Sequence, residues 1–176
     1  MINPYKILRS PDASGAQEVD PLAGAAEGWE APKFPVLAAD RLVEMEIVES
    51  TKGLVKDEKG KQEGRESLTL KLRTTKDYVD RDGKPLRAGF IGFKRIRLSP
   101  TIGDPTKRDH TMKDIGAELG VVLRCCGMGS RSPRDLLNDP SIILKSVVVM
   151  KTKISPAQGG FPESNDFTFV PPEGSK

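Results

Sequence analysis

The sequence predicts a mainly β domain in which five strands form a barrel and one helix separates the third strand from the fourth. Apolar and charged residues alternate over 41–50 and again over 66–75, as they do in half-buried strands. A helical spacing of apolar residues follows a third extended segment, and a β-branched segment comes after the helix. Only 5% of the 176 residues are aromatic, which suits a barrel interior filled by small and branched side chains.

The first two strands have the clearest pattern. In RLVEMEIVES, Val43, Met45 and Ile47 share one face, and in ESLTLKLRTT the apolar face carries three leucines. Residues 51–65 between them are hydrophilic and contain three glycines, so we expect a long loop there.

A turn precedes the third strand. The Asp82-Gly83 step predicts a hairpin, because Gly adopts the positive φ that other residues resist. The returning strand covers 88–99. Its phase is ambiguous, because Phe90, Ile96 and Leu98 share one face, while Ile91, Phe93, Arg95 and Arg97 share the other. Gly89 and Gly92 predict a bulge or a close backbone approach within this strand.

Capping residues predict the helical segment. Thr111 with Asp114 three positions later is a form of the capping box, and Gly127 is a C-terminal cap. A second start signal at Ser132-Pro133 predicts only a short helical piece, because Pro140 ends it.

Two further strands are predicted at 141–153 and at 166–170. The resulting order of strand, strand, strand, helix, strand, strand is that of the OB-fold, a five-stranded, partly open Greek-key barrel. A sandwich with a covering helix is the alternative. We therefore expect a five-stranded Greek-key OB-fold-like barrel with one helix between strands 3 and 4.

Charge divides the chain, although the net charge is only +3. Residues 1–50 contain four basic and nine acidic residues, whereas residues 66–113 contain twelve basic and six acidic ones. An asymmetry of this kind indicates an interaction surface and an opposing tail. We expect an extended or flexible acidic arm at 1–36, an OB-fold-like domain at 37–172 and a C-terminal tail at 173–176.

Several function classes are excluded by composition. No stretch approaches the roughly 20 apolar residues that cross a bilayer, and the N-terminus lacks a secretory signal pattern, so we expect a cytoplasmic protein. The adjacent Cys125-Cys126 form no disulfide framework, and a single His argues against structural zinc. No set of nucleophile, base and metal ligands is visible, so we expect no enzyme, no cofactor and no metal.

Four segments together resemble the single-stranded-DNA-binding proteins of tailed bacteriophages that contain one OB-fold. They are RLVEMEIVEST with the Lys and Gly that follow, ESLTLKLRTT, ELGVVLRCCGMG, and VVVMKTKISPAQGGFPESNDFTFVPP. The resemblance covers about residues 37–172 and implies sequence-tolerant binding of single-stranded DNA in phage replication, recombination or repair. The chain departs from that family at its end, PPEGSK, which lacks an acidic tail.

Binding of single strands needs cations along the phosphate path and flat side chains on which bases stack. The candidate nucleic-acid-binding residues are Lys52, Lys71, Arg73, Tyr78, Lys94, Arg95, Arg97, Lys153 and Phe161. The alternative is that these cations form a solvated face and that Phe90 and Phe93 belong to the core.

Two other functions stay open. The barrel is also a building block of virion structural or decoration proteins, in which the arm, with Tyr5, Trp29 and Phe34, joins a neighbouring subunit. A replication or recombination adaptor would bind protein through the barrel edge. The expected partners are thus single-stranded DNA, further copies of the chain through the arm, and replication proteins, with no membrane.

Overall fold

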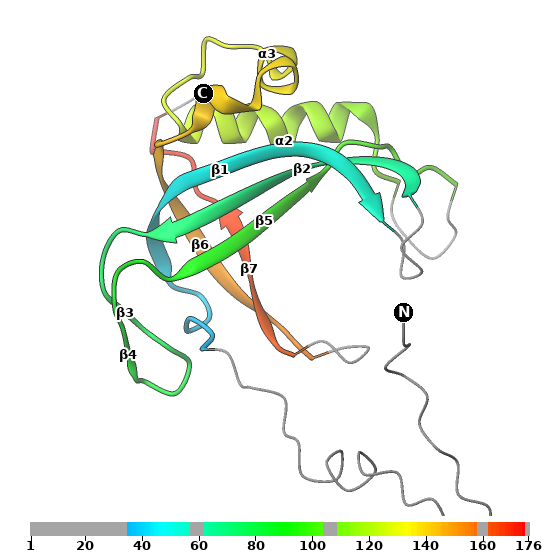
Figure 1. The fold of residues 1–176 in the computed structure, drawn as a ribbon. Coiled ribbons are helices and arrows are strands. Elements are labelled where there is room, and N and C mark those ends of the chain that lie inside the picture. The colour runs from blue at the N-terminus through cyan, green and yellow to red at the C-terminus, as the bar shows by residue number, and fades with distance from the viewer. Residues whose placement is uncertain (1–34, 57–61, 104–108, 158–161, 175–176) are drawn as a thin grey trace, which may run out of the picture. The chain divides into compact units, whose positions relative to one another are not determined.

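The computed structural model describes residues 35–56, 62–103, 109–157 and 162–174 (Figure 1). These belong to one compact unit, Phe34–Lys176. Residues 1–34 of the predicted arm, and Phe161, lie outside the described residues. In the part of the chain that is described, no helix is long and apolar enough to cross a membrane.

The main sheet has five strands that are antiparallel throughout, in the order β5-β2-β1-β6-β7. The strands are β1 (Leu42–Lys56), β2 (Gln62–Thr74), β5 (Ile91–Arg97), β6 (Val147–Ser155) and β7 (Ser164–Phe169). A small ribbon of β3 (Tyr78–Val79) and β4 (Pro85–Leu86) turns at Gly83, whose φ is 80°. The Asp82-Gly83 turn is therefore confirmed, but the returning strand is Pro85–Leu86, and the strand predicted at 88–99 pairs with β2 instead.

Strands β1 and β2 extend beyond the predicted limits. Residues 51–56 and 62–65, which the sequence predicts to be loop, pair across the hairpin, so that prediction is wrong at both ends of the segment. Thr51–Leu54 are exposed, and composition alone therefore does not mark them as strand. The apolar alternation itself is confirmed, because Met45 and Ile47 are fully buried.

Strand β5 keeps one phase from end to end. Its register with β2 is continuous, so there is no bulge, but the predicted close approach is confirmed at Gly92, where a Cβ would stand 2.5 Å from Phe167 Cε2. Gly92, Ile96 and the following Leu98 are buried, whereas Phe93 on the opposite face is exposed. The face with Arg95 is thus the solvent face, as the charge pattern predicts, and Phe93 belongs to it.

Two helices and one 3-10 turn connect β5 to β6. Helix α2 (Met112–Cys125) starts at the Thr111 capping box, α3 (Pro133–Asn138) starts at a second capping box, and η1 spans Pro140–Ile143. Gly127 after α2 has a φ of 71°, which confirms the predicted cap.

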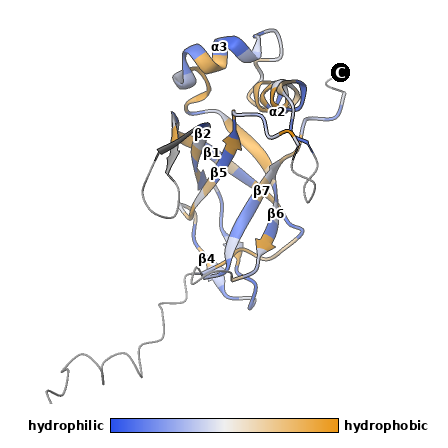
Figure 2. Cartoon of the chain, turned by 90° about the vertical axis from the view of Figure 1, so that its right-hand side faces the viewer, coloured by the Kyte–Doolittle hydropathy of each residue, from blue (hydrophilic) through white to orange (hydrophobic). Residues whose placement is uncertain are grey.

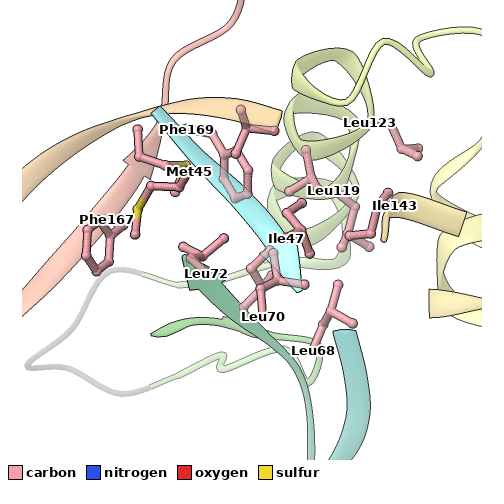
Figure 3. Packing of buried hydrophobic residues seen from close by; sticks show 14 of the residues in the cluster. Met45, Ile47, Leu68, Leu70, Leu72, Leu119, Leu123, Ile143, Phe167 and Phe169 are labelled. Carbon is pink, nitrogen blue, oxygen red and sulfur yellow. The ribbon is translucent and has the colours of Figure 1, made fainter. Parts of the chain in front are cut away.

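The core lies between α2 and the inner side of the sheet. Alternation of hydrophilic and hydrophobic residues along the strands is visible in Figure 2. Leucines of β2 and Ile47 of β1 lie toward Leu119 of α2, and Leu123, Phe167 and Phe169 belong to the same core cluster (Figure 3). Figure 1 shows α2 and α3 gathered at one end of the sheet and the β3–β4 ribbon at the other.

The predicted five-stranded Greek-key OB-fold-like barrel with one helix between strands 3 and 4 is wrong. The fold is mainly β, and its five-stranded antiparallel sheet is open. In the described chain, the outer edges of β5 and β7 form no ladder with each other. The ring of Phe167 lies against Gly92, and Lys94 forms an ion pair with Asp166, so side chains occupy the seam in place of backbone hydrogen bonds. The connection before β6 holds two helices, so the one-helix topology is wrong, although the short helical piece predicted at Ser132-Pro133 is present as α3.

Candidate nucleic-acid interface

The side of β1, β2 and β5 that faces away from the core is called here the outer face. Strand register arranges its side chains in rows, since directly opposed residues point to the same side of a sheet. The rows, each read from β1 through β2 to β5, are Glu46–Arg73–Ile91, Glu49–Lys71–Phe93, Thr51–Thr69–Arg95 and Gly53–Ser67–Arg97.

Phe93 is the aromatic residue that sequence reasoning assigned to the core. Its side chain lies on the outer face and is 59% exposed. Lys71 is its direct neighbour on β2, and Arg95 follows it two positions along β5 on the same face. The usable signal was its phase: alternation places Phe93 with Arg95 and Arg97, not with Ile96.

Ion pairs neutralise much of the outer face near β1. Arg73 Nη2 lies 2.6 Å from Glu46 Oε2, and Lys71 Nζ lies 3.6 Å from Glu49 Oε2. A hydrogen bond from Lys76 lowers the pKa of Glu44, and a second from Thr75 acts in the same direction. The predicted cations Lys71 and Arg73 therefore face carboxylates, which compete with a nucleic-acid phosphate for them.

Arg95 and Arg97 differ from these paired cations. Both are exposed on β5. Among the described residues Arg95 has no carboxylate partner, and Arg97 donates from Nη1 to Thr101 Oγ1 at 3.1 Å. Positive charge on the outer face is thus least compensated at this end of β5.

Two predicted cations do not share the outer face. Lys94 has the phase of Ile96, and its ammonium lies 3.6 Å from Asp166 of β7 with the side chain only 16% exposed. Lys52 is directly opposite the buried Leu68, and its ammonium lies 3.6 Å from Glu66.

The remaining predicted nucleic-acid-binding residues are not placed on the outer face by the structure. Tyr78 of β3 accepts a 2.6 Å hydrogen bond on Oη from the Glu44 backbone N–H and packs against the core, so it acts as a structural anchor. Lys153 lies on β6, directly opposite Asp166 of β7. In the sheet order, β1 and β2 separate β6 from β5. Phe161 lies outside the described residues.

An apolar cleft of about 490 Å³ adjoins Phe93 at the open seam. Phe90, Ile91 and Phe93 line it from the β5 side, and Phe167 lines it from β7. Pro35 and Val36 form another part of its wall. A flat apolar group bound beside Phe93 would therefore find further apolar surface.

Other kinds of site are not supported by the described side chains. No three His, Cys, Asp or Glu residues among them lie close enough to hold a metal ion. Comparisons with protein-family models, curated proteins and solved structures found no match for the chain.

Proposed function

We propose that this protein binds single-stranded nucleic acid, and DNA in particular, along the outer face of β5 and β2. The observation that carries the proposal is the exposed ring of Phe93 on the same strand face as Arg95 and Arg97. This arrangement offers one stacking surface and two cations in a line. It is the combination that sequence-tolerant binding of a single strand requires.

The energetics of such a site favour unpaired bases. Stacking of a base on an aromatic side chain contributes about 1–3 kcal/mol, and every base has a face that can stack. A base in a duplex is already stacked on its neighbours and is not free to cover Phe93. The apolar cleft beside Phe93 would add contact for the exposed base edge.

The cellular role that follows from the resemblance is coating of DNA during phage replication, recombination or repair. It forms part of the same proposal, and it rests on the sequence segments and not on the geometry. The weak compensation of charge at Arg95 and Arg97 supports binding to a polyanion in general.

A second function is favoured by a different part of the sheet. Leu42, Val147 and Val149 are 60%, 52% and 40% exposed on the solvent side of β1 and β6. Clusters of exposed apolar residues often mark protein interfaces. We therefore keep assembly, as in a virion structural or decoration protein, as the alternative proposal.

The test is the anisotropy of a labelled oligo-dT titrated with the full chain. Replacing Phe93 by Leu keeps an apolar side chain but removes the aromatic face, and we expect affinity to fall about 5- to 150-fold, about 1–3 kcal/mol. Phe93→Tyr should bind like the wild type. The exposed Met112 on α2 provides a matched control, and Met112→Ala should not change affinity.

Absence of oligo-dT binding at low salt would exclude the proposed function. Equal affinity of the wild type and Phe93→Leu would exclude Phe93 as the stacking surface. Assembly is tested separately by sedimentation of Val147→Lys/Val149→Lys, which should lower the oligomer size only if the β1–β6 surface is an interface.

A further inference from the structure

A hollow of about 420 Å³ lies at one end of the outer face, beside residues 51–54 of β1, Ser67 and Thr69 of β2 and Arg95 of β5. Its walls come from three strands and contain both polar and apolar groups. The lining residues are Thr51, Lys52, Gly53, Leu54, Ser67, Thr69 and Arg95.

The strand register explains why the surface is hollow at this point. Thr51, Thr69 and Arg95 form one cross-strand row, and the next row begins with Gly53 opposite Ser67. A Cβ placed on Gly53 would meet no atom within 4 Å, so the missing side chain leaves open space. Ser67 beside it is only 5% exposed, at the floor of the depression.

The polar groups around the hollow are unused by the fold. Among the described residues, the hydroxyls of Thr51, Ser67 and Thr69 make no hydrogen bond, and Arg95 has no carboxylate partner. Lys52 is also among the lining residues, although it has the opposite phase in β1 and its ammonium lies 3.6 Å from Glu66. Hydroxyls and a guanidinium together supply several donors to one bound anion.

We propose that this hollow is a phosphate-binding subsite, in which Arg95 and the hydroxyls of Thr51, Ser67 and Thr69 donate to the phosphate oxygens. An Arg fork matches two oxygens of a phosphate, and Ser and Thr hydroxyls are common phosphate contacts in nucleic-acid complexes. The ion-paired cations Lys71 and Arg73 offer no comparable set of free donors.

The identity of the phosphate as part of a nucleic-acid backbone rests on the proposed function. Arg95 follows Phe93 by two residues, which is about 7 Å along a strand. One nucleotide spans a similar distance between its phosphate and its base. A single-stranded nucleic acid that stacks one base on Phe93 would therefore place a neighbouring phosphate in the hollow.

Two variants test the subsite in the full chain. Gly53→Val places a branched side chain in the hollow at a position where a Cβ meets no atom within 4 Å, so we expect folding to be retained. Arg95→Gln removes the charged donor, and Arg134→Gln on α3 is the matched charge control. Each variant is titrated with inorganic phosphate by amide NMR and with labelled oligo-dT by anisotropy over a range of salt, and its thermal unfolding is recorded.

We expect phosphate to shift the amide resonances of Thr51, Thr69 and Arg95 in the wild type but not in Gly53→Val. Oligo-dT affinity should fall at least tenfold in Gly53→Val. In Arg95→Gln the slope of log affinity against log salt should become flatter by about 0.7, the value for one phosphate contact on a single strand. Arg134→Gln should match the wild type.

The outcomes separate this inference from the proposed function. Phosphate shifts at the hollow without any oligo-dT binding support the subsite and overturn the proposed function. That outcome assigns the site to a free phosphate group. Oligo-dT binding that is unchanged in both Gly53→Val and Arg95→Gln overturns the subsite and leaves the function standing. Absence of both phosphate shifts and oligo-dT binding overturns both.

Discussion

Gly92 on β5 lies so close to Phe167 on β7 that a Cβ on the glycine would stand 2.5 Å from Cε2 of the ring. Phe167 is only 1% exposed, and its ring is part of the core cluster. The two residues belong to the two edge strands of the sheet, 75 positions apart in sequence. Their contact, together with the Lys94–Asp166 ion pair, holds the edges near each other without a backbone ladder.

The first prediction concerns this contact. Gly92→Ala should lower the free energy of unfolding by about 1–3 kcal/mol, because the added methyl forces a buried ring to move. Denaturant unfolding measures the loss. Part of it should be recovered when Phe167→Leu is added, as a double-mutant cycle between touching residues shows.

Gly116 in α2 is the control for this prediction, because a Cβ there meets nothing within 4 Å. Gly116→Ala should stabilise the protein by about 0.5–1 kcal/mol. Destabilisation of similar size in both variants would contradict a specific role for the contact between Gly92 and Phe167.

The second prediction concerns the carboxylates of the outer face. In the double variant Glu46→Gln/Glu49→Gln, Arg73 and Lys71 lose their partners and become available to phosphates. Affinity for oligo-dT should rise, and the slope of log affinity against log salt should steepen by up to about 0.7 per released cation. Anisotropy titrations at several salt concentrations measure both quantities.

Net charge alone also raises affinity for a polyanion, so Glu118→Gln on α2 is the comparison. It should produce a smaller change, since Glu118 is not on the outer face. An equal change in affinity per removed charge would show that the bound DNA does not follow the outer face.

The third prediction concerns Cys126. Burial raises the pKa of its thiol from 9.0 to about 11, despite an opposing hydrogen bond with Ser146. Because the folded-state pKa is the higher one, this contribution to stability is complete below pH 9 and is lost as pH rises toward 11. The difference in unfolding free energy between the wild type and Cys126→Ala should shrink over this interval.

Chemical labelling gives an independent check. Iodoacetamide reacts with thiolates, so Cys126 should be labelled slowly in the native protein at pH 8 and rapidly in denaturant. Rapid native labelling of Cys126 would show that the thiol is not protected by burial.

The fourth prediction concerns the capping box of α3. The backbone N–H of Ser132 donates to Asp135 Oδ2 at 2.9 Å, which lowers the pKa of that carboxyl below 3.8. The stability contribution is therefore present above pH 3.8 and is lost as pH falls through the folded-state pKa. Asp135→Asn should be less stable than the wild type at pH 6, and the difference should vanish in acid.

Asp82→Asn is the comparison, because Asp82 lies at an exposed turn and caps no helix. Its stability should follow the wild type across the same pH range. A difference between Asp135→Asn and the wild type that persists unchanged at low pH would mean that the effect is steric.

Local rules were sufficient for most individual elements. Alternation identified the buried face of β2, because an antiparallel strand with one wet side repeats every two residues. Thr111 with Asp114, and Ser132 with Pro133, marked helix starts because the donors at a helix start need nearby acceptors. These features depend on residues a few positions apart and are therefore readable from sequence.

The candidate site was only partly readable. The sequence named Arg95 and Arg97 as candidate cations, but the phase of their strand was ambiguous, and only the structure puts both on the solvent face. The sequence did not show that Lys71 and Arg73 would face glutamates, because the partners come from β1 through a register that changes at the bulge after Ile47. Residue type favours the core for Phe93, the ambiguous phase of its strand does not decide against it, and only the structure shows that it is exposed.

By itself the sequence determined a mainly β unit, the inner and outer faces of its long strands, and the ends of its helices, since all of these follow from local periodicity and capping. Only the tertiary structure decided that the sheet stays open, that cations near β1 are neutralised, and that Gly53 leaves a hollow beside Arg95. Each of these depends on which residues of distant strands lie opposite one another, and the ladder pairs residues by register rather than by their spacing in the chain.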